Sequence, residues 1–76
     1  MKSFSPARKR IDVSPGESVR VLRELQALSQ ARLSALSGVP RSALSAIEND
    51  RVNLDAERAK VLARALNCHP AVLVRH

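Results

Sequence analysis

The sequence predicts an all-α fold of five short helices. Two amphipathic segments between Ser29 and Glu48 are joined by a glycine turn at Gly38, and leucine and isoleucine recur in them at helical spacing. Capping residues stand at the starts of other predicted helices, and no stretch alternates apolar and polar residues as a strand does. The 76 residues contain no internal repeat, so they predict one small domain.

The first 13 residues are predicted to form a basic, flexible N-terminal arm. They contain four basic residues and one acid, Asp12. Such an arm can follow a DNA minor groove or its phosphates, and the alternative is a disordered segment with only a diffuse electrostatic contribution. The folded helical domain is predicted to span residues 14–76.

The first helix is predicted over residues 15–27. Residues 14–17 read S-P-G-E, which is a capping box with proline at the first helical position. Three apolar residues are expected along its buried side: Val19, Leu22 and Leu25.

The second and third helices are predicted over residues 30–37 and 41–48. Ser29 is a suitable N-cap for the second helix, and Gly38 can adopt the left-handed conformation that ends it. The third helix therefore starts at an angle to the second, as in a helix-turn-helix. Four apolar residues are expected on the buried faces: Leu33, Leu36, Leu44 and Ile47.

Two further helices are predicted after a turn-rich loop at residues 49–53. Asn53 is expected to cap the fourth helix, and Asn67 is expected to end it. Pro70 can then open a last short helix that continues to residue 74. The buried side of the fourth helix is expected to consist of Ala59, Leu62, Ala63 and Leu66.

The composition favours a polyanionic partner. The formal net charge is +6, from 13 Lys and Arg against 7 Asp and Glu. Phe4 is the only aromatic residue, so the side chains that stack on RNA or single-stranded bases are missing and duplex DNA is the expected nucleic acid. The charges are spread over several helices, which disfavours a membrane surface. Without an apolar span or secretion signal, and with one cysteine, the sequence predicts a cytoplasmic protein.

The segment at residues 29–48, with L-R-E-L before it and A-K-V-L-A-R-A-L after it, resembles the DNA-binding domain of the phage Cro and repressor (Xre-type) family. The resemblance covers about residues 15–74. It implies a compact five-helix lambda-repressor-like fold and a transcriptional regulator, in most cases a repressor, that reads the major groove of duplex DNA.

A second resemblance gives an alternative function. The sequence P-G-E at residues 15–17 is similar to the start of HigA-type antitoxins, which neutralise a toxin and repress their own operon. The tryptophan and glutamine that often follow the last helix in those antitoxins are absent here, since the sequence given stops at Arg75 and His76. The alternative is therefore an antitoxin of a type II toxin-antitoxin pair, with a toxin protein as partner.

The resemblance also implies a set of DNA contacts. Arg41 and Ser42 begin the recognition helix and should reach base edges, with Arg41 reading guanine through O6 and N7. Gln30 would bond a phosphate and brace the recognition helix, with help from the Ser29 hydroxyl and the nearby amides. Further contacts are expected from Ser45 to a base or phosphate, from Ala46 to a thymine methyl, and from Asn49, Arg51 and the amides near Asn53 to phosphates.

The same residues have simpler interpretations. Arg41 and Arg51 are ordinary solvated charges on the alternative view, and the serines of the recognition helix only add solubility. Arg23 and Glu48 are different, because the resemblance implies a partly buried ion pair between them with a structural role.

No metal or catalytic site is predicted. Cys68 and His69 are adjacent and only His76 could join them, so the ligand number and spacing of a zinc site are missing. Cys68 is expected to be a small core residue, and His69 a cap before Pro70. The sequence indicates no Ser, His and Asp triad and no glycine-rich phosphate loop, so no cofactor is expected and the chain is predicted not to be an enzyme.

A homodimer on a palindromic operator is expected, because a single recognition helix reads few base pairs. The half-sites of such an operator lie about 34–36 Å apart. The two-fold contact is expected in the last predicted helix, and the alternative is that its apolar residues close the core. These residues are Ala71, Val72, Leu73 and Val74.

Overall fold

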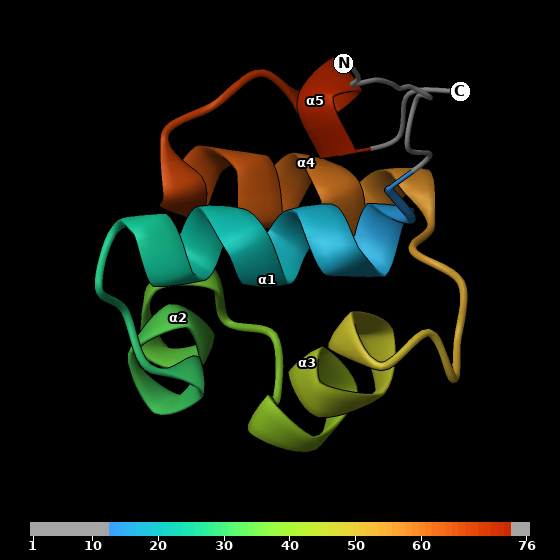
Figure 1. Cartoon of the computed structure of the whole chain (residues 1–76). Coiled ribbons are helices and arrows are strands. Elements are labelled where there is room, and N and C mark those ends of the chain that lie inside the picture. The colour runs from blue at the N-terminus through green and yellow to red at the C-terminus, as the bar shows by residue number, and fades with distance from the viewer. Residues whose placement is uncertain (1–12, 74–76) are drawn as a thin grey trace, which may run out of the picture.

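The computed structural model describes residues 13–73, and within that range it consists of helices and connecting turns (Figure 1). The helices are α1 (Pro15–Leu25), α2 (Gln30–Ser37), α3 (Arg41–Glu48), α4 (Ala56–Leu66) and α5 (Pro70–Leu73). The predicted all-α class is therefore confirmed. The basic arm up to residue 12 and the candidate dimer contact Val74 lie outside the described residues.

Local capping signals set the boundaries of the first two helices. The Ser14 hydroxyl accepts a hydrogen bond from the backbone N–H of Glu17 at 3.1 Å, and the Ser29 hydroxyl accepts one from Arg32 N–H at 2.9 Å. Gly38 ends α2 with a φ of 81°, in the left-handed region. All three predicted signals are confirmed.

Two predicted helix boundaries are wrong. α1 ends at Leu25 rather than at residue 27, because Ala27 adopts a left-handed φ of 57° and Leu28 N–H bonds back to Arg23 O at 3.0 Å. α4 is capped by Asp55 rather than Asn53. The Asp55 carboxylate accepts a hydrogen bond from Arg58 N–H at 2.8 Å, which places the first helical residue at Ala56.

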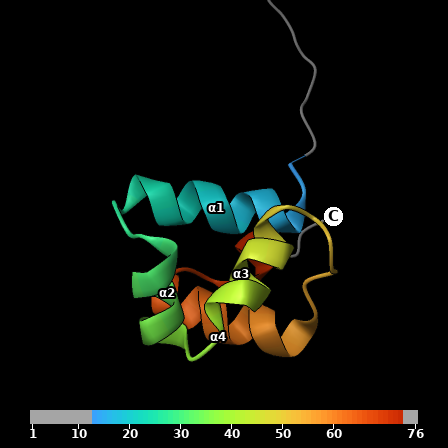
Figure 2. The same ribbon diagram turned by 90° about the horizontal axis from the view of Figure 1, so that it is seen from below.

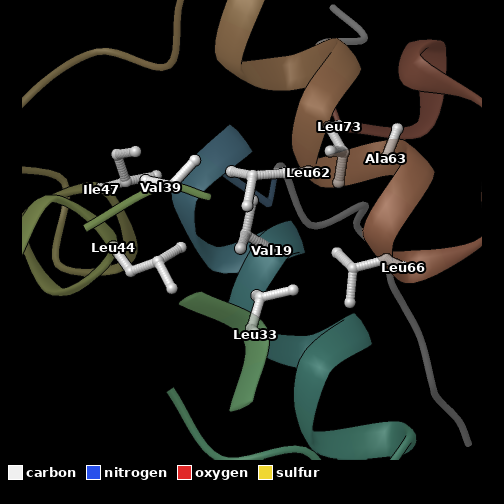
Figure 3. Close-up of a cluster of buried hydrophobic side chains, with 9 residues drawn as sticks. All are labelled: Val19, Leu33, Val39, Leu44, Ile47, Leu62, Ala63, Leu66 and Leu73. Carbon is white, nitrogen blue, oxygen red and sulfur yellow. The ribbon is translucent and has the colours of Figure 1, made fainter. Parts of the chain in front are cut away.

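All five helices contribute to one hydrophobic core (Figure 3). Eight residues predicted to be buried are confirmed as such: Val19, Leu33, Leu44, Ile47, Ala59, Leu62, Ala63 and Leu66. Leu22, also predicted on the buried side of α1, is half-buried against the core. The core therefore joins the two helices of the helix-turn-helix to α1, α4 and α5.

Three apolar residues do not lie where the sequence predicts. Leu25 is 76% exposed, because six residues turn a helix by about 600°, which places Leu25 about 120° away from the buried Val19. Leu36 is 48% exposed, since Leu33 takes the central position on the inner face of α2. Leu73 is fully buried inside the monomer, so it closes the core and is not available for a two-fold contact.

α1 and α3 approach each other closely at Gly16. A Cβ atom at this position would overlap the carbonyl oxygen of Ile47 and would lie 2.7 Å from an Asp50 carboxylate oxygen. The missing side chain therefore lets the end of α3 pack directly on the first turn of α1. Among residues 13–73, none of the helices is long and apolar enough to cross a membrane.

Candidate nucleic-acid interface

The turn between α2 and α3 is fixed by hydrogen bonds between Val39 and two serines of α2. The Ser34 hydroxyl donates to the carbonyl oxygen of Val39 at 2.6 Å, and Val39 N–H donates to the Ser37 hydroxyl at 3.1 Å. The Val39 side chain is buried in the core, while Pro40 directly precedes α3. These contacts set the angle at which α3 leaves α2, and the view from below in Figure 2 shows both helices on the same face of the molecule.

α3 has a buried face that anchors it in the core and an exposed face on the opposite side. Leu44 and Ile47 are buried beneath the helix, while Arg41 and Ser42 at its start are exposed. Ser45 and Ala46 in the next turn are half-buried. Of the side chains proposed to reach bases, Arg41 and Ser42 are thus exposed at the N-terminal end of α3, while Ser45 and Ala46 are less accessible.

A buried carboxylate joins the end of α3 to α1. Glu48 has only 2% of its side chain exposed and accepts two hydrogen bonds from Arg23, at 2.9 Å from Nε and 3.0 Å from Nη2. Arg23 also donates from Nη1 to Leu28 O at 2.8 Å. Hydrogen bonding of the Arg23 guanidinium to the Glu48 carboxylate raises the pKa of Arg23, although burial acts in the opposite direction. The ion pair that the sequence predicts is therefore present and lies in the structural position expected for it.

Gln30 binds the same carboxylate from α2. Its Nε2 donates to Glu48 Oε1 at 3.0 Å, so one side-chain oxygen of α3 serves both α1 and α2. This hydrogen bond is the bracing role expected for Gln30. An amide nitrogen carries two hydrogens, and this hydrogen bond uses one of them.

The end of α3 is closed by a left-handed residue. Asp50 has a φ of 59°, and the next residue, Arg51, donates its N–H to Ala46 O at 2.8 Å. The Asp50 carboxylate accepts a hydrogen bond from the Ser14 hydroxyl at 2.9 Å, which ties this turn to the start of α1. This contact could not be predicted from the sequence, because the two residues are 36 positions apart.

The residues after the recognition helix that are predicted to contact DNA phosphates lie in or near this turn. Asn49 donates from Nδ2 to Ser45 O at 2.8 Å, and Arg51 and Asn53 are exposed. Ser29, at the start of α2, is also exposed. The structure thus places exposed polar groups at the beginning of α2 and after the end of α3.

The chain is similar to a known protein family. A family model described as "Helix-turn-helix" (HTH_3) matches residues 19–73, which is most of the chain. This chain belongs to that helix-turn-helix family. A search of curated protein sequences found no match.

Solved structures agree with this family. The restriction-modification controller protein C.AhdI from Aeromonas hydrophila is 35% identical, with 82% of this chain and 94% of that one covered and a TM-score of 0.76. The P22 c2 repressor in complex with a synthetic operator is 31% identical, with 82% and 94% covered and a TM-score of 0.75. The DNA-binding domain of the P22 c2 repressor in solution is 26% identical, with 87% and 95% covered and a TM-score of 0.74. The predicted repressor-like five-helix fold is therefore confirmed.

The residues considered for a metal site have structural roles in this helix-turn-helix protein. His69 Nδ1 accepts a hydrogen bond from Ala71 N–H at 3.0 Å, so it caps α5 as predicted. Cys68 is partly buried against the core, and this burial raises the pKa of its thiol. Among residues 13–73, no three His, Cys, Asp or Glu side chains are grouped so that they could hold a metal ion.

Proposed function

We propose that this helix-turn-helix protein controls transcription by inserting the start of α3 into the major groove of an operator. The chain is a DNA-binding transcriptional regulator by family and by its likeness to a repressor and a controller protein. The single observation that carries the more specific proposal is the exposure of Arg41 and Ser42 on a helix anchored by Leu44 and Ile47. The outer residues can therefore face DNA without loss of core packing.

The proposed contacts follow from this exposure. Arg41 reads a guanine, because a guanidinium can bond O6 and N7 together, and Ser42, Ser45 and Ala46 contact neighbouring base edges. Phosphates on either side of the groove are held by residues before α2 and after α3. The groups proposed to bind these phosphates are the side chains of Ser29, Gln30, Asn49 and Arg51 and the backbone amides near Asn53.

The regulator is further proposed to be a repressor that binds as a homodimer to a palindromic operator. One α3 helix covers few base pairs, so specific binding requires two copies on adjacent half-sites. We assign it no catalytic activity and place it in the cytoplasm, where a bacterial-type operator lies. The family model and the structural relatives lend no specific support to the antitoxin alternative.

Selection of bound duplexes from a random library tests this function. The unmodified chain is expected to enrich one palindromic motif, and Arg41→Ala to lose the preference at one base pair of each half-site. Recovery of no motif, with affinity that depends only on salt, would contradict sequence-specific binding.

A further inference from the structure

An exposed apolar surface joins the end of α2 to the outer side of α4, and the two helices pack against each other (Figure 2). Leu36 is 48% exposed and Val61 is 37% exposed. Together with Ser37, Arg64 and Ala65 they line a hollow of about 360 Å³. Val61, Arg64 and Ala65 share one face of α4, because they are three and four positions apart, and the core residues of α4 lie on its other sides.

A second hollow adjoins the first across Arg64, which lines both. Its volume is about 390 Å³, and its other lining residues are Lys60, Cys68 and Pro70. We refer to the residues of both linings together as the α2–α4 groove. The groove is apolar on the side of α2 and basic on the side of Pro70.

The two cations of the groove have no acidic partner within residues 13–73. Lys60 and Arg64 are both exposed, and the ion pairs in this part of the chain all involve arginines of α1. The only acid of α4, Glu57, lies in its first turn and takes part in none of these pairs. A ligand with carboxylates would therefore gain ion pairs in the groove without breaking existing ones.

We propose that the α2–α4 groove binds an acidic, amphipathic segment of a second protein. Apolar side chains of that segment cover Leu36 and Val61, and its carboxylates pair with Lys60 and Arg64. Exposed ion pairs contribute little affinity, so burial of the apolar pair supplies most of the binding free energy. The two cations select an acidic segment over a neutral or basic one.

Nucleic acid fits this groove less well. A phosphate backbone offers partners to Lys60 and Arg64, but it leaves Leu36 and Val61 in contact with water. The phosphate contacts proposed for α2 are at its start, and Leu36 lies about 9 Å further along the helix than Gln30. None of the residues proposed to contact DNA lines the groove. The groove therefore stays accessible when α3 occupies a duplex.

A second copy of this chain also fits less well. A two-fold contact through the groove would bring Lys60 and Arg64 of both copies into one interface, and neither lining contains an acid. Like charges placed together in this way oppose association. The groove thus favours a partner of opposite charge.

Selection of peptides by the full chain tests the proposal. The probe is a random phage-displayed library of peptides long enough for about four helical turns. The expected result is enrichment of peptides that combine Asp or Glu with leucine-like residues at helical spacing. Recovery of no peptide, or only of peptides without acids, would overturn the proposal. These experiments contain no DNA, so their outcome is independent of operator binding.

Variants of the apolar pair locate the binding of the most enriched peptide. Leu36→Ser combined with Val61→Ser is expected to raise its dissociation constant at least about tenfold in fluorescence anisotropy titrations. Leu25→Ser combined with Val72→Ser is the matched control, because it changes the same residue types at exposed positions outside the groove. This control should bind the peptide like the unmodified chain. Equal losses in the two double variants would contradict binding in the groove.

A charge reversal tests the basic side of the groove. Arg64→Glu is expected to weaken peptide binding at least about fivefold, because it places a carboxylate against the acids of the peptide. Arg20→Glu makes the same change at an exposed position on α1 and should have a smaller effect. The reverse order would contradict the proposal. Circular dichroism checks that each variant is helical.

A measurement on the unmodified chain does not depend on the folding of variants. The methyl NMR signals of Leu36 and Val61 are expected to shift when the peptide is added, and those of Leu25 and Val72 are expected to stay. Shifts confined to Leu25 and Val72 would place the peptide on the other side of the molecule and overturn the proposal.

Two controls identify other occupants of the groove. Arg64→Gln and Arg20→Gln should weaken binding of a non-operator duplex to a similar, small extent. A larger loss in Arg64→Gln, with a salt dependence reduced by about one unit of slope, would assign the groove to DNA phosphates. Dissociation of a dimer by Leu36→Ser with Val61→Ser in sedimentation equilibrium would assign it to a second copy. Either result would overturn the proposal.

Discussion

Glu48, the last residue of α3, is held by two hydrogen bonds from the guanidinium of Arg23 in α1. The Glu48 side chain is 2% exposed and that of Arg23 is 12% exposed. Because water has little access to either charge, each is stabilised mainly by the other. The same carboxylate accepts from Gln30, so the pair fixes the orientation of α3 relative to both α1 and α2. A structural ion pair thus positions the proposed DNA-reading helix.

Loss of one partner of this pair should be strongly destabilising. Glu48→Ala is expected to lower the free energy of unfolding by about 3–5 kcal/mol, because it leaves the Arg23 charge buried without a partner. Urea denaturation measures the change. Arg20→Ala is the matched control, since it removes the exposed pair with Glu17 and should cost less than about 1 kcal/mol. Equal losses in the two variants would contradict the buried role.

Gly16 should not accept a side chain. Gly16→Ala is expected to cost about 1–3 kcal/mol, because the new Cβ meets the backbone of Ile47 and α3 has to move. Gly38 is the control. Nothing lies within 4 Å of a Cβ there, and asparagine tolerates its left-handed φ of 81°, so Gly38→Asn should be milder than Gly16→Asn. The reverse order in thermal unfolding would contradict the close approach of α1 and α3.

A stabilising change is expected at Ala27. This residue has a left-handed φ of 57°, which costs an alanine about 1–2 kcal/mol relative to its preferred conformations. Ala27→Gly should therefore raise the free energy of unfolding by up to about 1 kcal/mol, after the greater flexibility of glycine in the unfolded chain is included. Asn67→Gly should gain less, because asparagine already tolerates the left-handed φ of 63° at the end of α4.

Two arginines should affect DNA binding in different ways. Arg41→Ala is expected to cost about 1–3 kcal/mol on the selected operator and to relax the preference at one base pair. Arg51→Ala should weaken all duplexes to a similar extent and reduce the salt dependence by about one unit of slope. Titrations at several salt concentrations distinguish the two. Identical behaviour of both variants would show that Arg41 reads no base.

Most of the helix boundaries could be predicted because their signals are local. Ser14, Ser29, Gly38 and Asn67 act on backbone groups within a few residues, so their roles do not depend on the rest of the fold. The α4 cap was misplaced by two residues because Asn53 and Asp55 both have suitable side chains. Which of the two caps α4 depends on the path of the loop after α3, and in the structure the cap is Asp55.

The candidate DNA interface was predicted less completely. The sequence indicated which residues of α3 point outward and which anchor it. The resemblance implied that Gln30 braces α3 but not that Glu48 is its partner, and nothing indicated the hydrogen bond between Ser14 and Asp50, since each bond joins residues far apart in the chain. These contacts arise only when three helices pack against one another.

The sequence by itself determined the number of helices, their capping and the anchoring face of α3, because these depend on spacing and backbone chemistry over a few residues. Only the tertiary structure decided which apolar residues are covered. Leu73 is buried, while Leu25, Leu36 and Val72 are exposed, although all four are apolar residues of helices. Burial depends on which sides of a helix its neighbours cover, and helical periodicity within one segment does not specify how many sides that is.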